Sequence, residues 1–169
     1  MRHRGVAGLA ALLVERGISV ARFNFPYREK GSRRPDPMPA LRAAYEAVVA
    51  EVRPEAERLI LGGRSMGGRV ASMMAADGFG CDGLLLVAYP LHPAGQPEKL
   101  RDAHLARIAV PVLCFNGTRD ALCRRDLMDN ALLKVRSWDM RWIEGADHSL
   151  SGEKELREIA DAAAAWLLQ

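Results

Sequence analysis

The sequence predicts a single α/β domain in which helices cover both faces of a mostly parallel sheet of about five strands, as a three-layer sandwich. Strand-like and helix-like segments alternate along the whole chain, and no linker interrupts them. Segment 83–89 is a continuous apolar run, which is typical of a strand buried on both faces, and 110–116 predicts another buried strand. The composition, 49% hydrophobic and 27% charged over 169 residues, fits one soluble globular domain.

The first third of the chain predicts helix, strand and helix. Apolar residues at helical spacing indicate a helix over 6–16 that Gly17 ends. Segment 18–25 mixes alternation with β-branched and aromatic residues, and this pattern predicts a strand. A loop rich in Gly, Ser, Arg and Pro follows over 29–39, and apolar residues at helical spacing over 41–52 predict the second helix.

The rest of the chain continues the alternation. A strand at 58–62, a glycine-rich turn and a helix at 66–77 come first. Strands at 83–89 and 110–116 follow, separated by a polar stretch with some helix. The chain then predicts a helix at 126–135, a strand at 139–144 and a last helix, whose apolar face includes Leu156, Ile159, Ala163 and Trp166. Each strand is therefore followed by a helical crossover, as a parallel sheet requires.

The charge balance gives no reason to expect a nucleic-acid partner. Lys and Arg number 24 against 21 Asp and Glu, a formal net charge of +3. Residues 1–34 carry most of the basic excess, but stacking aromatics do not accompany the arginines there, so we interpret this block as solvated surface. The three cysteines have no zinc-ligand spacing and are odd in number, which favours reduced thiols, a cytoplasmic protein and no metal site.

The N-terminal segment resembles a signal peptide only superficially. Arg2 and Arg4 precede the apolar run 5–14, but residues 15–17 are Glu, Arg and Gly instead of a cleavage site. No apolar run reaches the roughly 18 residues that a membrane span needs. We therefore expect no membrane partner.

The strongest chemical signal is Gly63-Arg64-Ser65-Met66-Gly67, which lies between an apolar strand and a helical pattern. In that context a G-x-S-x-G segment forms a sharp turn that projects the serine hydroxyl above the sheet, so Ser65 is the candidate nucleophile. The N–H of Met66, at the start of the following helix, is a candidate oxyanion donor. Taken alone, the pentapeptide fits a structural serine in a glycine turn nearly as well.

A nucleophilic serine needs a histidine base and a carboxylate that orients it. Asp120 follows the strand that ends near Asn116, and His148 follows the strand that ends near Glu144. Because the carboxyl ends of parallel strands share one edge of the sheet, we expect Ser65, Asp120 and His148 to converge there. Asp147 is the second choice for the carboxylate, since its position next to His148 in the chain directs its side chain elsewhere.

Five short segments together form a specific pattern. They are F-N-F-P-Y at Phe23 to Tyr27, G-G-R-S-M-G-G-R at Gly62 to Arg69, Y-P-L-H-P at Tyr89 to Pro93, G-T-R-D at Gly117 to Asp120 and G-A-D-H-S at Gly145 to Ser149. With them nearly the whole chain resembles the α/β hydrolase superfamily, in particular a small, lid-poor, dienelactone-hydrolase-like branch. The resemblance implies an α/β-hydrolase-like fold and a hydrolase of undefined substrate.

One part of the family pattern has no counterpart here. The family usually opens with a strand and a His-Gly-Ala-Gly-like loop that supplies a second oxyanion donor, placed just before the helix expected at 6–16. In the superfamily that strand lies between those expected at 18–25 and 58–62. We therefore expect residues 1–169 to form a single domain that is N-terminally truncated relative to the family, through a truncation or a start codon assigned too late. If the chain is complete instead, we expect the loss of one oxyanion donor to cost about 10²- to 10³-fold in rate.

The expected activity is that of a carboxylesterase-like serine hydrolase. We expect it to cleave an ester or thioester of a small acyl substrate through an acyl-enzyme, without a metal or organic cofactor. The short connections between elements leave little room for a lid, which favours small soluble substrates. A non-catalytic interaction module with this fold and a peptidase are the alternatives.

Three further residues are candidates for substrate contacts because they follow strand ends on the same edge. They are Tyr27, Arg28 and His92, although His92 also fits a locally bonded loop histidine.

The remaining chemistry-bearing residues point to structural roles. We expect His104 to be structural, since it falls in a predicted helix. Met73 and Met74 fit core packing, and no histidine partner is assigned to Cys123, which argues against a nucleophilic thiol.

Overall fold

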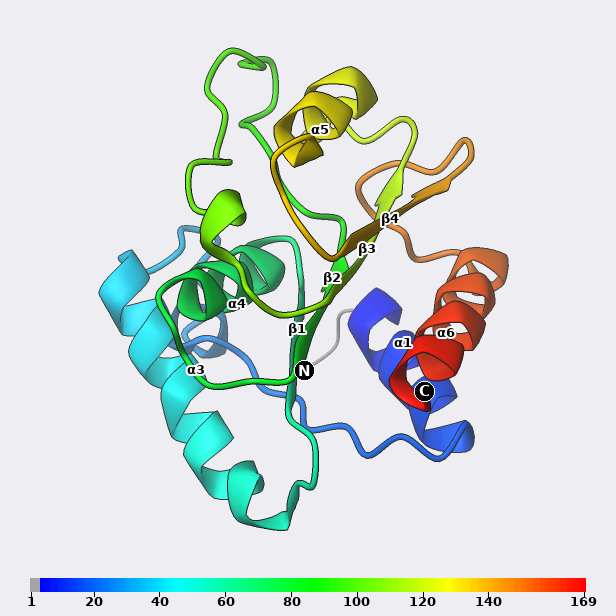
Figure 1. Ribbon diagram of the computed structural model, residues 1–169. Helices are drawn as coiled ribbons and strands as arrows, with labels where there is room; N and C mark the ends of the chain where they lie inside the picture. Colours follow the sequence, from blue (N-terminus) through cyan, green and yellow to red (C-terminus); the bar gives the residue numbers. More distant parts are fainter. Residues whose placement is uncertain (1–3) are drawn as a thin grey trace.

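The computed structural model describes residues 4–169, which form four parallel strands with helices on both sides (Figure 1). The strands are β1 (Ile60–Arg64), β2 (Gly83–Val87), β3 (Val112–Gly117) and β4 (Trp138–Ile143), and the strand order in the sheet is β1-β2-β3-β4. Every neighbouring pair is parallel. All four carboxyl ends therefore lie along the same edge of the sheet, and each strand pairs with the next one in the chain.

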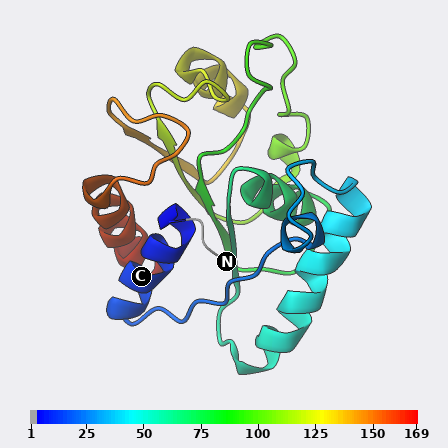
Figure 2. The same cartoon turned by 180° about the vertical axis from the view of Figure 1, so that it is seen from behind.

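The helices form the two outer layers. Helices α1 (Arg4–Glu15) and α6 (Glu153–Leu167) lie side by side on one face of the sheet, and α3 (Met38–Val52) and α4 (Met66–Ala76) cover the other (Figures 1 and 2). Helix α5 (Arg125–Leu132) connects β3 to β4. The short helices are α2 (Pro26–Glu29), η1 (Arg53–Glu55) and η2 (Leu105–Arg107).

The alternation of side chains along the strands divides the hydrophobic core in two. Leu84 and Leu86 of β2 pack with α3 and α4, whereas Leu85 and Val87 pack with α1 and α6. All five residues of β2 are buried. This explains its continuous apolar sequence, because a strand covered on both faces has no solvent side to reserve for polar residues.

The structure corrects one predicted strand. Segment 18–25 forms no ladder with any strand of residues 4–169, and the described sheet has four strands, close to the number expected. Its apolar residues are nevertheless packed, with Ile18 and Val20 against the α1/α6 core and Phe23 and Phe25 in the α3/α4 core. The alternating pattern arises from this packing. A strand also requires backbone hydrogen bonds to a neighbouring strand, which 18–25 does not form with any strand of residues 4–169.

The outer edge of β1 is partly covered by a tyrosine. The Tyr45 hydroxyl, from α3, donates to the carbonyl of Gly62 at 2.7 Å and accepts from the Gly62 N–H at 2.9 Å. Both groups of Gly62 point away from β2. Tyr45 therefore satisfies at this residue the two groups that a neighbouring strand would otherwise bond.

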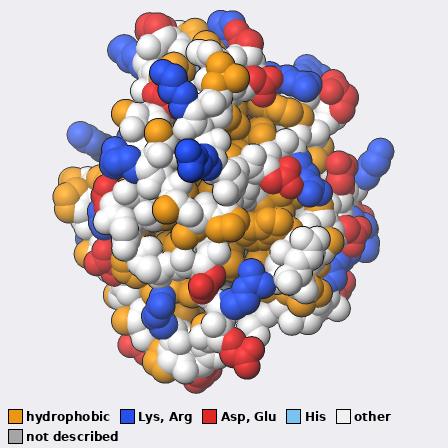
Figure 3. Space-filling model, in the orientation of Figure 1, with side chains coloured by type: hydrophobic (Ala, Val, Ile, Leu, Met, Phe, Trp, Pro, Cys, Tyr) orange, Lys and Arg blue, Asp and Glu red, His pale blue; other side chains and the backbone are white. Residues whose placement is uncertain are grey.

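The surface mixes charges of both signs. On the face in Figure 3, Lys and Arg side chains alternate with Asp and Glu side chains around a band of hydrophobic surface. Within residues 4–169, no helix combines the length and apolarity that crossing a bilayer requires.

Candidate active site at the carboxyl edge of the sheet

Ser65 occupies a strained turn between β1 and α4. Its backbone has φ 52° and ψ −117°, a conformation that non-glycine residues rarely adopt. The turn is tight because Gly63 lies against the first turn of α4, where a Cβ on Gly63 would stand 2.2 Å from the carbonyl carbon of Gly67. A Cβ on Gly68 would likewise lie 2.8 Å from the Gly63 oxygen, whereas one on Gly67 would meet nothing within 4 Å. The close approach therefore requires Gly63 and Gly68, and not Gly67.

The N–H of Met66 is the first of helix α4. As at any helix start, its intrahelical acceptor is missing, and within residues 4–169 it donates to no other group. It is adjacent to Ser65 and carries the positive end of the helix dipole. This N–H is available to an oxygen that becomes negative beside Ser65.

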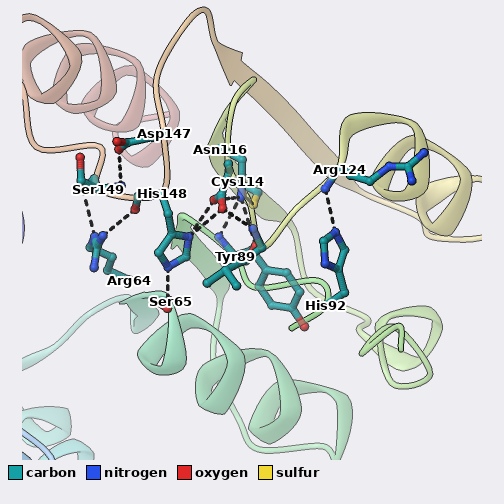
Figure 4. Close-up of polar contacts among 12 residues, drawn as sticks. Arg64, Ser65, Tyr89, His92, Cys114, Asn116, Arg124, Asp147, His148 and Ser149 are labelled. Carbon is teal, nitrogen blue, oxygen red and sulfur yellow. Dashed lines mark hydrogen bonds and ion pairs between the residues drawn. The ribbon is translucent and has the colours of Figure 1, made fainter. Parts of the chain in front are cut away.

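Three side chains from three loops form one hydrogen-bonded relay (Figure 4). His148 Nε2 lies 2.9 Å from Ser65 Oγ, and His148 Nδ1 lies 2.8 Å and 2.9 Å from the two carboxylate oxygens of Asp120. An ionised carboxylate can only accept, so Nδ1 carries the proton and Nε2 accepts from the serine hydroxyl. The structure thus brings together three residues that are far apart in the sequence.

The Asp120 side chain is fully buried and firmly held. Its exposed fraction is 0%, against 25% for the His148 side chain. Oδ1 accepts from the Leu122 N–H at 2.8 Å, and Oδ2 accepts from Asn116 Nδ2 at 3.1 Å. These two donors fix the orientation of the carboxylate toward His148.

Asn116 links the Asp120 loop to the neighbouring strand. This buried side chain accepts from the Tyr89 N–H at 3.0 Å and donates to the Tyr89 carbonyl at 3.1 Å, just beyond β2. Asn116 was not among the residues predicted from the sequence. The available signal was a polar residue at the end of an otherwise apolar strand, because buried amides need partners.

The loops that carry Asp120 and His148 are packed against each other. A Cβ on Gly117 would stand 2.1 Å from the Ala146 oxygen, and the Arg119 N–H donates to that oxygen at 2.9 Å. The Thr118 hydroxyl accepts from the Gly145 N–H at 2.9 Å. These contacts join the loop that carries Asp120 directly to the loop that carries His148.

Asp147 and Arg64 flank His148 without joining the relay (Figure 4). Asp147 is exposed and accepts from the Ser149 N–H at 2.7 Å, and these hydrogen bonds lower the pKa of its carboxyl group. Arg64 donates to the main-chain carbonyls of His148 and Ser149 at 2.5 Å and 3.2 Å. Burial lowers the pKa of the Arg64 guanidinium, while the negative charges of Asp120 and Asp147 act in the opposite direction.

His92, the third candidate substrate contact, is buried and held by main-chain groups. The residue is 2% exposed; Nδ1 donates to the Pro93 carbonyl at 2.9 Å and Nε2 accepts from the Arg124 N–H at 3.1 Å. With both ring nitrogens bonded to main chain, His92 ties the loop after β2 to the start of α5. This placement fits the alternative prediction of a locally bonded loop histidine, and a substrate contact stays a prediction.

Tyr27 and Arg28 lie in α2. The Tyr27 ring stacks on Phe25 with centroids 6.3 Å apart, and its N–H donates to Asp36 at 2.9 Å. Arg28 is exposed. Their part in substrate binding stays a prediction.

A second serine and histidine pair lies deeper in the molecule. Ser72 Oγ lies 2.9 Å from His104 Nε2 and donates to the Arg69 carbonyl at 2.8 Å, and Tyr89 Oη lies 3.2 Å from the same histidine nitrogen. Ser72 is 0% exposed. This network joins α4 to the segment before η2, and no substrate can reach its serine.

Other candidate groups are also buried. Met74 and Cys123 belong to the α3/α4 core, and burial raises the pKa of the Cys123 thiol, which disfavours the thiolate. Within residues 4–169, no cluster of three or more His, Cys, Asp or Glu side chains is arranged to hold a metal ion.

Comparison with protein families gives one match over nearly the whole chain. A family model described as an alpha/beta hydrolase domain matches residues 1–166.

Solved structures share the fold at low sequence identity. An alpha-beta serine hydrolase homologue from Coxiella burnetii superposes with a TM-score of 0.79 and 24% identity, over 99% of this chain and 77% of that one. The esterase domain of a Rhodothermus marinus protein gives 0.73 and 18%, over 98% and 79% of the two chains. A monoacylglycerol lipase from Paleococcus ferrophilus gives 0.75 and 17%, over 95% and 87%.

Proposed function

This chain belongs to the alpha/beta hydrolase domain family, and from that premise we propose that it is a serine esterase acting on an ester or thioester of a small acyl substrate. The observation that carries the proposal is the relay in which Ser65 donates to His148 and His148 donates to Asp120. The hydrolase family and the structural likeness to an esterase domain and a lipase support the reaction class.

The first half of the reaction acylates the serine. Ser65 Oγ attacks the carbonyl carbon of the substrate while His148 Nε2 takes the hydroxyl proton. Asp120 stays ionised and stabilises the imidazolium. The carbonyl oxygen becomes negative and accepts from the Met66 N–H. When the intermediate collapses, His148 returns the proton to the departing alcohol or thiol, and the acyl group remains on Ser65.

The second half repeats these steps with water. His148 Nε2 takes a proton from water as the water oxygen attacks the acyl carbon, and the same proton then returns to Ser65 Oγ. The products are a carboxylic acid and the free enzyme. No external oxidant, reductant or cofactor is needed to balance either half.

The test is covalent labelling with a fluorophosphonate, followed by peptide mass spectrometry. We expect one adduct on Ser65 and none on the Ser65→Ala variant. Ser72 is a control within the same chain, because it also lies beside a histidine but is inaccessible. An unlabelled Ser65 in folded protein, or labelling that persists in Ser65→Ala, would overturn the proposal.

Two alternatives share this fold. A peptidase would use the same relay, so parallel ester and peptide panels separate it from an esterase. A non-catalytic interaction module would leave Ser65 unlabelled although the protein is folded.

A further inference from the structure

Arg64 lies between the strand of the nucleophile and the loop of the base. It is the last residue of β1 and directly precedes Ser65. Side chains alternate across the sheet, and Leu61 packs into the α3/α4 core while Ile60 packs against the α1/α6 core. Arg64, four residues after Ile60, is therefore on the side of the sheet where the chain enters α6. Figure 4 shows its guanidinium directed at the segment that carries His148 and Ser149.

The contact that Arg64 makes is with main chain instead of a carboxylate. Nη2 donates to the His148 carbonyl at 2.5 Å, and Nε donates to the Ser149 carbonyl at 3.2 Å. Two adjacent N–H groups of one planar group thus hold two consecutive carbonyls. A lysine carries a single donor centre and cannot match this fork.

The segment held in this way turns sharply on both sides of His148. Gly145 has φ 72° and Leu150 has φ 39°, so the backbone leaves its ordinary conformations before and after the histidine. Strand β4, which precedes the segment, is at the opposite edge of the sheet from β1. Arg64 therefore ties the nucleophile's strand directly to a strained segment that starts three strands away.

Building on the proposed function, we propose that Arg64 is a positioning residue, whose guanidinium holds the main chain of His148 and Ser149 so that His148 Nε2 stays in line with Ser65 Oγ. The carboxylate of Asp120 orients the imidazole ring from one side, and Arg64 fixes the backbone from which the ring projects. Arg64, which lies between Gly63 and Ser65 in the G-x-S-x-G turn, thereby has a specific role in this chain.

The kinetic test compares Arg64→Ala and Arg64→Lys with a matched surface variant, Arg157→Ala. Arg157 pairs with Glu153 on α6 and touches neither Ser65 nor His148. On an ester substrate we expect Arg64→Ala to lower kcat by about 10- to 100-fold, with a much smaller change in KM, because misplacement by about 1 Å costs rate more than binding. Arg64→Lys should fall between Arg64→Ala and the wild type, and Arg157→Ala should match the wild type.

Chemical rescue separates positioning from general damage to the fold. Guanidinium ion, added far below denaturing concentrations, should restore part of the kcat of Arg64→Ala and none of that of Asp120→Asn. An Arg64→Ala variant that labels Ser65 and turns over at the wild-type rate would overturn the inference. So would a loss of activity that tracks a loss of folded protein and does not respond to guanidinium.

A readout independent of turnover distinguishes this inference from the proposed function. The His148 Nδ1 proton, bonded to Asp120, gives a low-field proton NMR signal that reports on the ring position. We expect this signal to shift or broaden in Arg64→Ala and to stay unchanged in Arg157→Ala. A wild type that fails to label at Ser65 defeats the proposed function, whereas an unchanged signal in Arg64→Ala defeats the positioning role.

Discussion

His104 is a residue whose charge state depends on the folded structure. Burial lowers its pKa from 6.5 to about 4, and the positive charges of Arg69 and Arg107 add to this effect. Its Nε2 is engaged by Ser72 and Tyr89. The neutral imidazole is therefore the form that fits the network between α4 and η2.

This pKa shift predicts acid sensitivity. The unfolded chain binds a proton on His104 near pH 6.5, whereas the folded chain stays neutral down to about pH 4, so the free energy of unfolding falls as pH falls between these values. We expect roughly 1–2 kcal/mol of this loss between pH 7 and pH 5. Urea unfolding at both pH values measures it.

The matched variant is His104→Gln, which cannot titrate. Its free energy of unfolding should change less between pH 7 and pH 5 than that of the wild type, whatever its stability at pH 7. Equal losses in the two proteins would contradict the assignment to His104.

At the scale of elements, the junction of β1 and α4 depends strongly on Gly63, which is only one of the two glycines of the G-x-S-x-G motif. A Cβ at Gly63 would overlap the backbone of Gly67, and backbone cannot be moved as cheaply as the end of a side chain. We expect Gly63→Ala to lower the free energy of unfolding by at least about 2 kcal/mol. Thermal or urea unfolding provides the measurement.

Gly67→Ala is the natural comparison, because its added methyl group meets nothing within 4 Å. It should fold with nearly wild-type stability, although both positions are glycines of the same pentapeptide. If the two variants were equally destabilised, the close approach at Gly63 would not be the reason that the turn needs glycine.

The elements that could be predicted are those whose burial determines the hydrophobicity of their own segment. Strands β2 and β3 are buried on both faces, so their apolar runs lie close to their real positions. The prediction of a strand over 18–25 was wrong, because packing of its apolar residues into two cores produces a strand-like pattern without a strand partner. Helix α2 was not predicted, since its four residues are too few to show a period.

The convergence of Ser65, Asp120 and His148 was predictable because it depends on topology alone: loops that follow parallel strands meet at one edge. The support around them was not. Asn116 and Arg64 bind main-chain carbonyls and N–H groups. Such partners cannot be predicted from sequence spacing, because nearly every residue has the same main-chain groups. For His92 the sequence left two interpretations open, a substrate contact and a locally bonded loop histidine, and the hydrogen bond from the Arg124 N–H fits the second.

At the scale of the whole molecule, the outer edge of β1 depends on Tyr45. Burial raises the pKa of this phenol to about 12, so the hydroxyl keeps its proton and bonds both polar groups of Gly62. Tyr45→Phe leaves those two groups without a partner. We expect a loss of about 1–3 kcal/mol in the free energy of unfolding, together with stronger self-association through the exposed strand edge.

Urea unfolding and sedimentation at several protein concentrations test both parts. Tyr27→Phe is the control for stability, because the Tyr27 hydroxyl makes no hydrogen bond to the rest of residues 4–169. A Tyr45→Phe variant as stable and as monodisperse as Tyr27→Phe would contradict this role of the hydroxyl.

The strand order has a consequence for how the molecule is made. Because β1, β2, β3 and β4 are laid down in the sheet in the order in which they are synthesised, each new strand finds its partner already present on the growing chain. Ser65 is synthesised before His148, which follows β4. Likewise, α1 is synthesised before α6, its neighbour on the sheet. On a growing chain, the contact between Ser65 and His148, which we propose to be catalytic, can therefore form only after β4 has been synthesised.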